Sequence, residues 1–238
     1  MPIVNPSNPV AKIVIDHHAA ARVLERFDLD YCCGGKRSLA DMCDAEGLVL
    51  DDVVAAIDEA IVGGGNGKTD WASLPVDALA AAIDAAHHGY TRESLAHLGP
   101  LVEKVARVHG ERHVELAGVR SLFATLSAEL DSHLRKEEQE LFPAVDALGK
   151  GDAGARGFAF AAGLAALRDE HEKVGALLRD LRTTTRAYAV PPGGCTSFRV
   201  LYAGLADLAA DLHTHIHLEN HLLFPKIEAA LAAHARVE

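Results

Sequence analysis

The sequence has 238 residues, of which 49% are hydrophobic and 5% aromatic, and its net charge is −11. This acidic balance argues against a nucleic-acid partner or an anionic membrane surface, and no apolar run approaches the ~18 residues of a membrane span. Residues 1–15 lack the pattern of a signal peptide, and the four cysteines do not indicate a disulfide framework, so we expect a cytoplasmic protein.

Residues 10–62 are predicted to form a small helical module. The three prolines in residues 1–10 indicate an extended lead-in. Apolar residues at helical spacing predict the first helix over 16–27, with Asp16 as its N-cap.

Two further helices complete the predicted module. Ser38 and Asp41 form an acidic version of the capping box, which starts a second helix, and Gly47 ends it. A third helix is expected over 51–61. Three short helices of this kind can close a module of about 50 residues.

The glycine-rich stretch over 63–73 predicts a flexible linker, and a larger domain is expected over 74–235. The many Ala and Leu residues and the scarcity of aromatic residues favour packed helices. Long amphipathic segments with short loops predict an all-α, antiparallel four-helix bundle. The expected helices cover 73–108, with a kink at Gly99-Pro100, and 113–148, 156–189 and 196–235.

One eleven-residue pattern occurs twice, as H-x-x-x-E-x-x-x-L-F-P beginning at His133 and at His215. Within each copy, a His and a Glu four residues apart lie on one face of a helix. Such a pair offers a metal ion one nitrogen and one carboxylate. Glu137 and Glu219 supply the carboxylates.

Four histidines, one on each long helix, are predicted to lie at one level of the bundle. At ~1.5 Å per residue, the length of helix from each histidine to the following loop nearly equals the length from that loop to the histidine on the next helix. The first two histidines are 45 residues apart and the last two are 44 apart, as in a duplicated helical hairpin. The predicted ligand set is His88, His133, Glu137, His171, His215 and Glu219.

This ligand set differs from the Cys-rich set of structural zinc and from the oxygen ligands of calcium or magnesium. Carboxylates that can bridge two metals within a helix bundle suit two iron ions, with manganese as the second choice. Each iron would receive two histidines and share both glutamates. Open positions would remain for oxygen or nitric oxide.

Several other residues remain alternatives. His109 reaches the metals only if Pro100 redirects its helix, and Glu170 is either an outer hydrogen-bond acceptor or a solvated carboxylate. The remaining candidates are Glu138 in place of Glu137, and His213, His217 or His221 in place of His215.

The repeated pattern resembles that of hemerythrin-like cation-binding domains. The Cys32-Cys33-Gly34-Gly35 module before the bundle resembles the short domain found in the di-iron, repair-of-iron-centres family. The resemblance covers nearly all of residues 12–230. It implies a non-haem di-iron centre, a role in restoring iron-sulfur clusters damaged by nitric oxide or oxidants, and damaged iron-sulfur proteins as clients. His88 is chosen over His87 because Arg92-Glu93 and Leu95 then fit the family pattern.

Cys32 and Cys33 are predicted to form a redox or iron-transfer site. Gly34-Gly35 allows a tight turn that exposes the thiols, while Lys36-Arg37 and the following helix N-terminus favour thiolate. A loop with two partly buried thiols is the structural alternative. Cys43 is expected in the core and Cys195 in a loop.

Three functions are compatible with these features. The first is cluster repair, with iron donation as one route. The others are a hemerythrin-like sensor of oxygen or nitric oxide, and a di-iron nitric oxide reductase, so the sequence leaves open whether the protein is an enzyme. It also leaves open the oligomeric state, a homodimer included.

Overall fold

The computed structural model describes residues 2–63, 70–150 and 159–234. All regular elements in these residues are helices, which confirms the predicted all-α class. The chain divides into a terminal unit, Met1–Pro75 with His213–Glu238, and a bundle unit, Val76–Leu212. Helix α10 (Thr196–Leu218) begins in the bundle unit and ends in the terminal unit.

The flexible linker expected over 63–73 remains a prediction, because residues 64–69 lie outside the described residues. No described helix is both long and apolar enough to cross a membrane.

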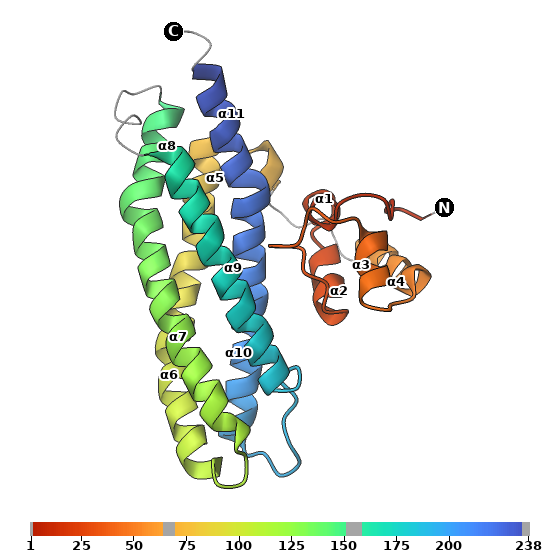
Figure 1. Ribbon diagram of the computed structural model, residues 1–238, viewed down its shortest axis with the longest axis vertical. Helices are drawn as coiled ribbons and strands as arrows, with labels where there is room; N and C mark the ends of the chain where they lie inside the picture. Colours follow the sequence, from red (N-terminus) through yellow and green to blue (C-terminus); the bar gives the residue numbers. More distant parts are fainter. Residues whose placement is uncertain (1, 64–69, 151–158, 235–238) are drawn as a thin grey trace. The chain divides into compact units, whose positions relative to one another are not determined.

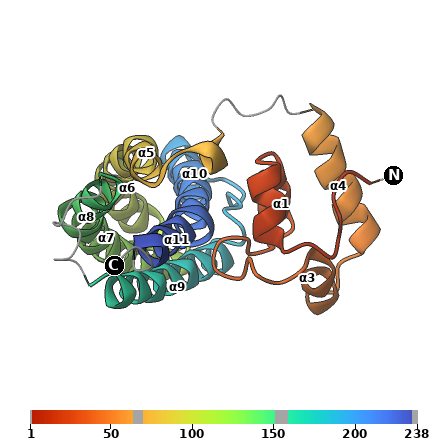
Figure 2. The same ribbon diagram turned by 90° about the horizontal axis from the view of Figure 1, so that it is seen from above.

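The bundle unit is built from four helical rods. In Figure 1, α6, α7, α9 and α10 run side by side, and Figure 2 shows them grouped around a common centre. Helix α7 packs against α6 and α9, and α5 packs against α8. The bundle helices before α10 are α5 (Val76–Ile83), α6 (Gly89–His109), α7 (Glu115–Lys136), α8 (Phe142–Gly149) and α9 (Phe160–Thr184).

The core of the bundle follows from apolar residues that recur at steps of three and four. Such a step keeps a stripe of side chains on one face of a helix. Burying one Leu side chain contributes about 1.5–3 kcal/mol to folding. The buried stripe of α7 consists of Leu116, Val119, Phe123, Leu126 and Leu130.

A turn of π-helix interrupts each of the first two rods. The π-helical turn η2 (Asp84–His88) joins α5 to α6, and η3 (Glu137–Leu141) joins α7 to α8. Pro143, in the first turn of α8, has no N–H for a helical bond and its ring crowds the preceding turn. The π turn η3 therefore lies directly before Pro143. Pro100, by contrast, lies inside α6 without ending it, so no helix boundary falls at Gly99-Pro100.

Helix α9 ends at Thr184, five residues before the predicted end at 189. Arg186, Ala187 and Tyr188 have φ values of 52°, 56° and 60°, which a right-handed helix cannot contain. The Tyr188 amide donates instead to the Thr185 hydroxyl, at 3.0 Å. The predicted start of this helix at 156 lies outside the described residues.

The terminal unit contains four short N-terminal helices where three were predicted. They are α1 (Val10–Asp16), α2 (Ala20–Arg26), α3 (Leu39–Ala45) and α4 (Leu50–Gly63). Asp16 ends α1 and caps no helix, so that expectation was wrong. Val10, Ile13 and Val14 are buried at helical spacing, and Pro9 is tolerated because it precedes the first turn.

Ser38 is confirmed as the N-cap that starts α3. Ser38 Oγ accepts from the Asp41 amide at 3.1 Å and donates to Asp41 Oδ2 at 2.6 Å. The unit also contains the short 3₁₀ turn η1 (Trp71–Ser73), the end of α10, the π turn η5 (Glu219–Leu223) and α11 (Phe224–His234).

Candidate metal centre

The predicted ligands continue the apolar stripes of their helices. His133 and Glu137 follow Leu126 and Leu130 at steps of three and four, and their side chains are 3% and 0% exposed. His171 occupies the same kind of position on α9, between Leu167 and Val174. A polar residue at a core position is costly unless it is paired or coordinated. The helices therefore direct these side chains toward one another in the interior.

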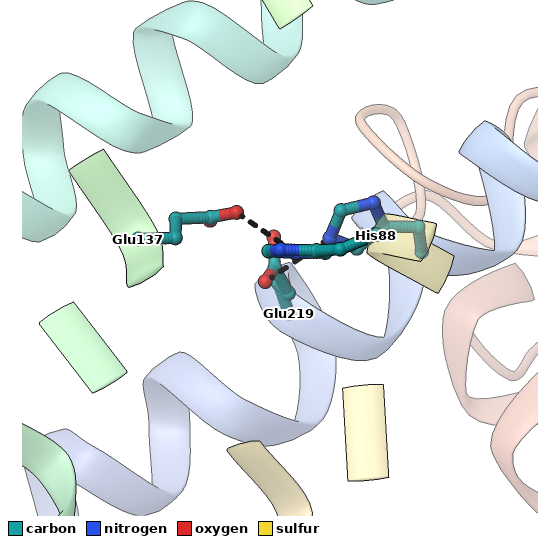
Figure 3. Close-up of side chains that lie close together, drawn as sticks. His88, Glu137 and Glu219 are labelled. Carbon is teal, nitrogen blue, oxygen red and sulfur yellow. Dashed lines mark ion pairs between the residues drawn. The ribbon is translucent and has the colours of Figure 1, made fainter. Parts of the chain in front are cut away.

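In the bundle unit, Glu137 lies between two imidazoles. Figure 3 shows the Glu137 carboxylate directed toward the His88 side chain. Its Oε2 is 3.4 Å from Nε2 of His88, and its Oε1 is 3.3 Å from Nε2 of His133. Nε2 of His171 lies 3.2 Å from Nε2 of His133. The structure thus gathers four of the six predicted ligands, with their inner atoms facing one another.

The outer nitrogen of each flanking histidine meets a carboxylate. His88 Nδ1 is 2.9 Å from Glu138 Oε1, and His133 Nδ1 is 2.9 Å from Glu170 Oε2. Of the two alternatives for Glu170, an outer hydrogen-bond acceptor or a solvated carboxylate, the structure shows the acceptor. Glu138 holds the outer nitrogen of His88, a contact that the sequence analysis missed.

A cation supports each of these outer carboxylates. Arg92 donates twice to Glu138, at 2.5 and 2.9 Å, and Lys136 contacts Glu170. The Arg92 hydrogen bond is the main cause that lowers the pKa of Glu138. The hydrogen bond from His133 is the main cause that lowers the pKa of Glu170 to about 2. Both carboxylates are therefore anionic and accept a hydrogen bond from the Nδ1–H group of their histidine.

This proton placement tests whether the site fits a metal. A neutral imidazole whose proton is on Nδ1 has a lone pair on Nε2. The Nε2 atoms of His88 and His133 then face the oxygens of Glu137, an acceptor facing an acceptor. A cation between such atoms turns this repulsion into coordination. The donor set of nitrogen and carboxylate oxygen fits a transition-metal ion.

The terminal unit presents the second His-Glu pair. His215 Nε2 lies 3.2 Å from Glu219 Oε1, and both side chains are buried. Glu219 is the first residue of η5, just as Glu137 is the first residue of η3. The two copies of the motif therefore have the same local backbone, with an ordinary helical turn before the Glu and a π turn after it.

The alternative histidines have other partners. Nδ1 of His87 lies 2.8 Å from Asp211 Oδ1. His109, at the end of α6, lies 3.2 Å from Cys195 Sγ and packs edge-on against Phe198. Pro100 has not redirected the helix toward the ligands, so His109 belongs to this separate cluster.

Asp30, Cys32 and Cys33 form a compact group in the terminal unit, with ligand atoms within 4.8 Å of one another. Cys32 is 2% exposed, and its thiol donates to Asp30 Oδ1 at 3.2 Å. A hydrogen bond with Cys33, followed by burial and nearby negative charge, raises the pKa of Cys32. The expectation of an exposed, readily ionised thiol is therefore wrong for Cys32. Cys33 is half-buried, and Cys43 lies in the core as predicted.

The fold and these buried side chains define a helix-bundle, cation-binding protein. Residues 80–227 match the hemerythrin HHE cation-binding domain, and residues 6–61 match a domain of unknown function, DUF542. The chain is 34% identical to the iron-sulfur cluster repair protein YtfE of Edwardsiella ictaluri over 92% of this chain and 95% of the relative. Its identity to YtfE of Escherichia coli O81 is 32%, with the same shares covered. The chain belongs to this family of hemerythrin-type repair proteins.

Proposed function

We propose that the protein holds two iron ions and serves to repair iron-sulfur clusters damaged by nitric oxide or oxidants. The observation that carries the metal assignment is the buried Glu137 carboxylate facing Nε2 of both His88 and His133. The proposed ligands are His88, His133, Glu137, His171, His215 and Glu219.

Two features support joining the two His-Glu pairs into one site. Helix α10 runs unbroken from Thr196 to Leu218, so His215 lies on a helix that begins in the bundle unit, and Glu219 follows directly in η5. The hemerythrin HHE match spans 80–227, which includes all six proposed ligands. Glu137 and Glu219 would hold the irons together with the four histidines.

When bound, the di-iron centre would supply redox chemistry and open positions for oxygen or nitric oxide. The protein's own residues orient and protect that centre. Glu138 and Glu170 hold protons on the outer nitrogens of His88 and His133, which keeps the inner lone pairs available. The stripe of leucines in α7 and α9 excludes water from the interior.

Cluster repair is favoured because two relatives, each matched by this chain over 95% of its own length, are named iron-sulfur cluster repair proteins. Damaged iron-sulfur proteins would be the clients, in the cytoplasm. We assign Cys32 and Cys33 to a redox or iron-transfer role at the terminal unit.

Metal analysis and Mössbauer spectroscopy on native protein and on Glu137→Ala test the ligand assignment. We expect two irons per chain in native protein and a marked loss of iron in the variant. Glu140→Ala is the matched control, because Glu140 is exposed on the same turn. An unchanged iron content in Glu137→Ala would contradict the assignment.

A repair assay then tests the function. The iron-loaded protein should restore the activity of a nitrosylated iron-sulfur enzyme under reducing conditions, and Glu137→Ala should not. Turnover of nitric oxide to nitrous oxide with a reductant would instead support a nitric oxide reductase. Reversible gas binding without repair or turnover would support a sensor.

A further inference from the structure

The backbone carbonyl of Cys32 is a contact point between the Cys-Cys segment and the π turn η5. It accepts a hydrogen bond from Nε2 of His221 at 2.9 Å and another from Nδ2 of Asn220 at 3.2 Å. One residue earlier, the carbonyl of Tyr31 lies 3.2 Å from Nδ1 of His217. The backbone carbonyls of Tyr31 and Cys32 therefore attach the Cys-Cys segment to the end of α10 and to η5. The orientation of the segment depends on the Cys32–Cys33 peptide.

Tight packing around Gly35 reinforces this attachment. A Cβ atom there would lie 2.4 Å from the Tyr31 carbonyl oxygen, 2.7 Å from Ala11 Cβ and 2.8 Å from Nε2 of His221. The segment therefore fits against α1 and η5 only with glycine at this position. A small rotation of the backbone here would break several contacts together.

The two thiols are placed to react with each other. The Sγ atoms of Cys32 and Cys33 are 3.6 Å apart, and the Cys32 thiol already points at the Asp30 carboxylate. Asp30 also accepts from the amides of Cys32 and Cys33, at 3.0 and 2.9 Å. These hydrogen bonds outweigh burial and lower the pKa of Asp30, so its carboxylate stays ionised and holds the Cys32 thiol next to Cys33.

We propose that Cys32 and Cys33 form a reversible disulfide on reaction with peroxide, and that its formation releases the Cys32 carbonyl from Asn220 and His221. A disulfide between neighbouring cysteines closes a small ring that distorts the intervening peptide. The Cys32 carbonyl must then turn away from its two donors. Strained disulfides of this kind are easily reduced, which suits a reversible modification.

The chemistry balances with hydrogen peroxide as the oxidant. The more accessible Cys33 sulfur attacks one peroxide oxygen, the O–O bond breaks, and the thiol proton joins the departing hydroxide as water. The Cys32 sulfur then displaces hydroxide from the Cys33 sulfenic acid, and the Cys32 thiol proton joins that hydroxide, which leaves as a second water. The two thiols lose two electrons, and the peroxide gains them.

Peptide mass spectrometry and hydrogen–deuterium exchange on the full-length protein, reduced and peroxide-treated, test this inference. We expect a Cys32–Cys33 disulfide, a several-fold faster exchange in residues 217–223, and recovery of both states with dithiothreitol. Cys33→Ser should show neither change, and Cys195→Ser should behave as native protein.

Two further variants separate chemistry from packing. Asp30→Asn keeps an oxygen acceptor for the turn but removes the negative charge that helps to hold the Cys32 thiol protonated, so disulfide formation should be at least as fast as in native protein, with unchanged exchange in the reduced protein. Gly35→Ala should raise exchange in 217–223 without any oxidant, whereas Gly34→Ala, whose added Cβ would meet nothing closer than 3.2 Å, should raise it far less.

Oxidation of Cys33 to sulfinic acid without a disulfide, or a disulfide that leaves exchange in 217–223 unchanged, would overturn the inference. Tight zinc or iron retention by Asp30, Cys32 and Cys33 that blocks oxidation would also overturn it. None of these outcomes bears on the di-iron assignment, because iron content reports that assignment separately.

Discussion

Glu138 binds the outer nitrogen of His88, with 2.9 Å between Oε1 and Nδ1. The preceding residue, Glu137, faces the inner nitrogen of the same ring. One imidazole is thus held between consecutive glutamates of a single π turn. The outer glutamate fixes the ring orientation, and the inner glutamate is a proposed ligand.

Replacing Glu138 with alanine should weaken metal binding by about 10–100-fold, because His88 loses the partner that fixes its tautomer and orientation. Competition with a chelator, read by metal analysis, measures this effect. Glu140→Ala should bind metal as native protein does. Equal affinities for Glu138→Ala and native protein would show that Asp84, whose Oδ1 lies 3.2 Å from His88 Nδ1, orients the ring without Glu138.

Asp30 should titrate below the usual pKa of an aspartate, because three groups of Cys32 and Cys33 donate to it. A lowered folded-state pKa contributes stability above the unfolded pKa, and this contribution is lost as the pH falls through the folded value. Amide chemical shifts of Cys32 and Cys33 in zinc-loaded protein follow the titration directly. Asp30→Asn should show no such transition, and a midpoint at or above the ordinary aspartate value would contradict the expectation.

Replacing Leu126 with alanine should destabilise the bundle by about 2–5 kcal/mol. Its side chain is completely buried in the stripe of α7, so truncation leaves a cavity. Urea unfolding of the zinc-loaded protein gives the free energy. Ser121→Ala, an exposed change on the same helix, should alter it by no more than about 0.5 kcal/mol.

Replacing Ser38 with alanine should cost about 1 kcal/mol, because the hydroxyl that caps α3 is lost. Ser38→Asp should retain most of the stability, since aspartate is also a good N-cap. Thermal unfolding followed by the signal of the terminal unit measures both. A Ser38→Ala protein as stable as native would mean that the Arg37 contact with the Asp41 carbonyl holds this helix start.

The bundle could be predicted from sequence because its signals are local and repeated. The three- and four-residue steps that end in Leu130, His133 and Glu137 specify both the core face and the direction of the ligands. Counting residues to each loop was enough to choose His133 and His171, whose Nε2 atoms are 3.2 Å apart.

Other features depend on contacts between distant residues and left no local signal. Nothing in the sequence near Glu138 indicates that its partners are His88 and Arg92, some 50 and 46 positions away. Cys32 looked accessible because glycines and basic residues follow it, yet folding buries it. The first helix was missed because the prolines around residues 2–9 concealed the apolar steps that begin at Val10.

The π turn η3 has a consequence for how the bundle tolerates change. It holds one residue more than an α-helix would, and an α-helix turns by about 100° per residue. If the same residues formed a regular α-helix, the extra residue would rotate the buried Val145 and Leu148 of α8 away from the core. Ligand placement and core packing therefore depend on the same extra residue, so a mutation that straightened this helix would damage both at once.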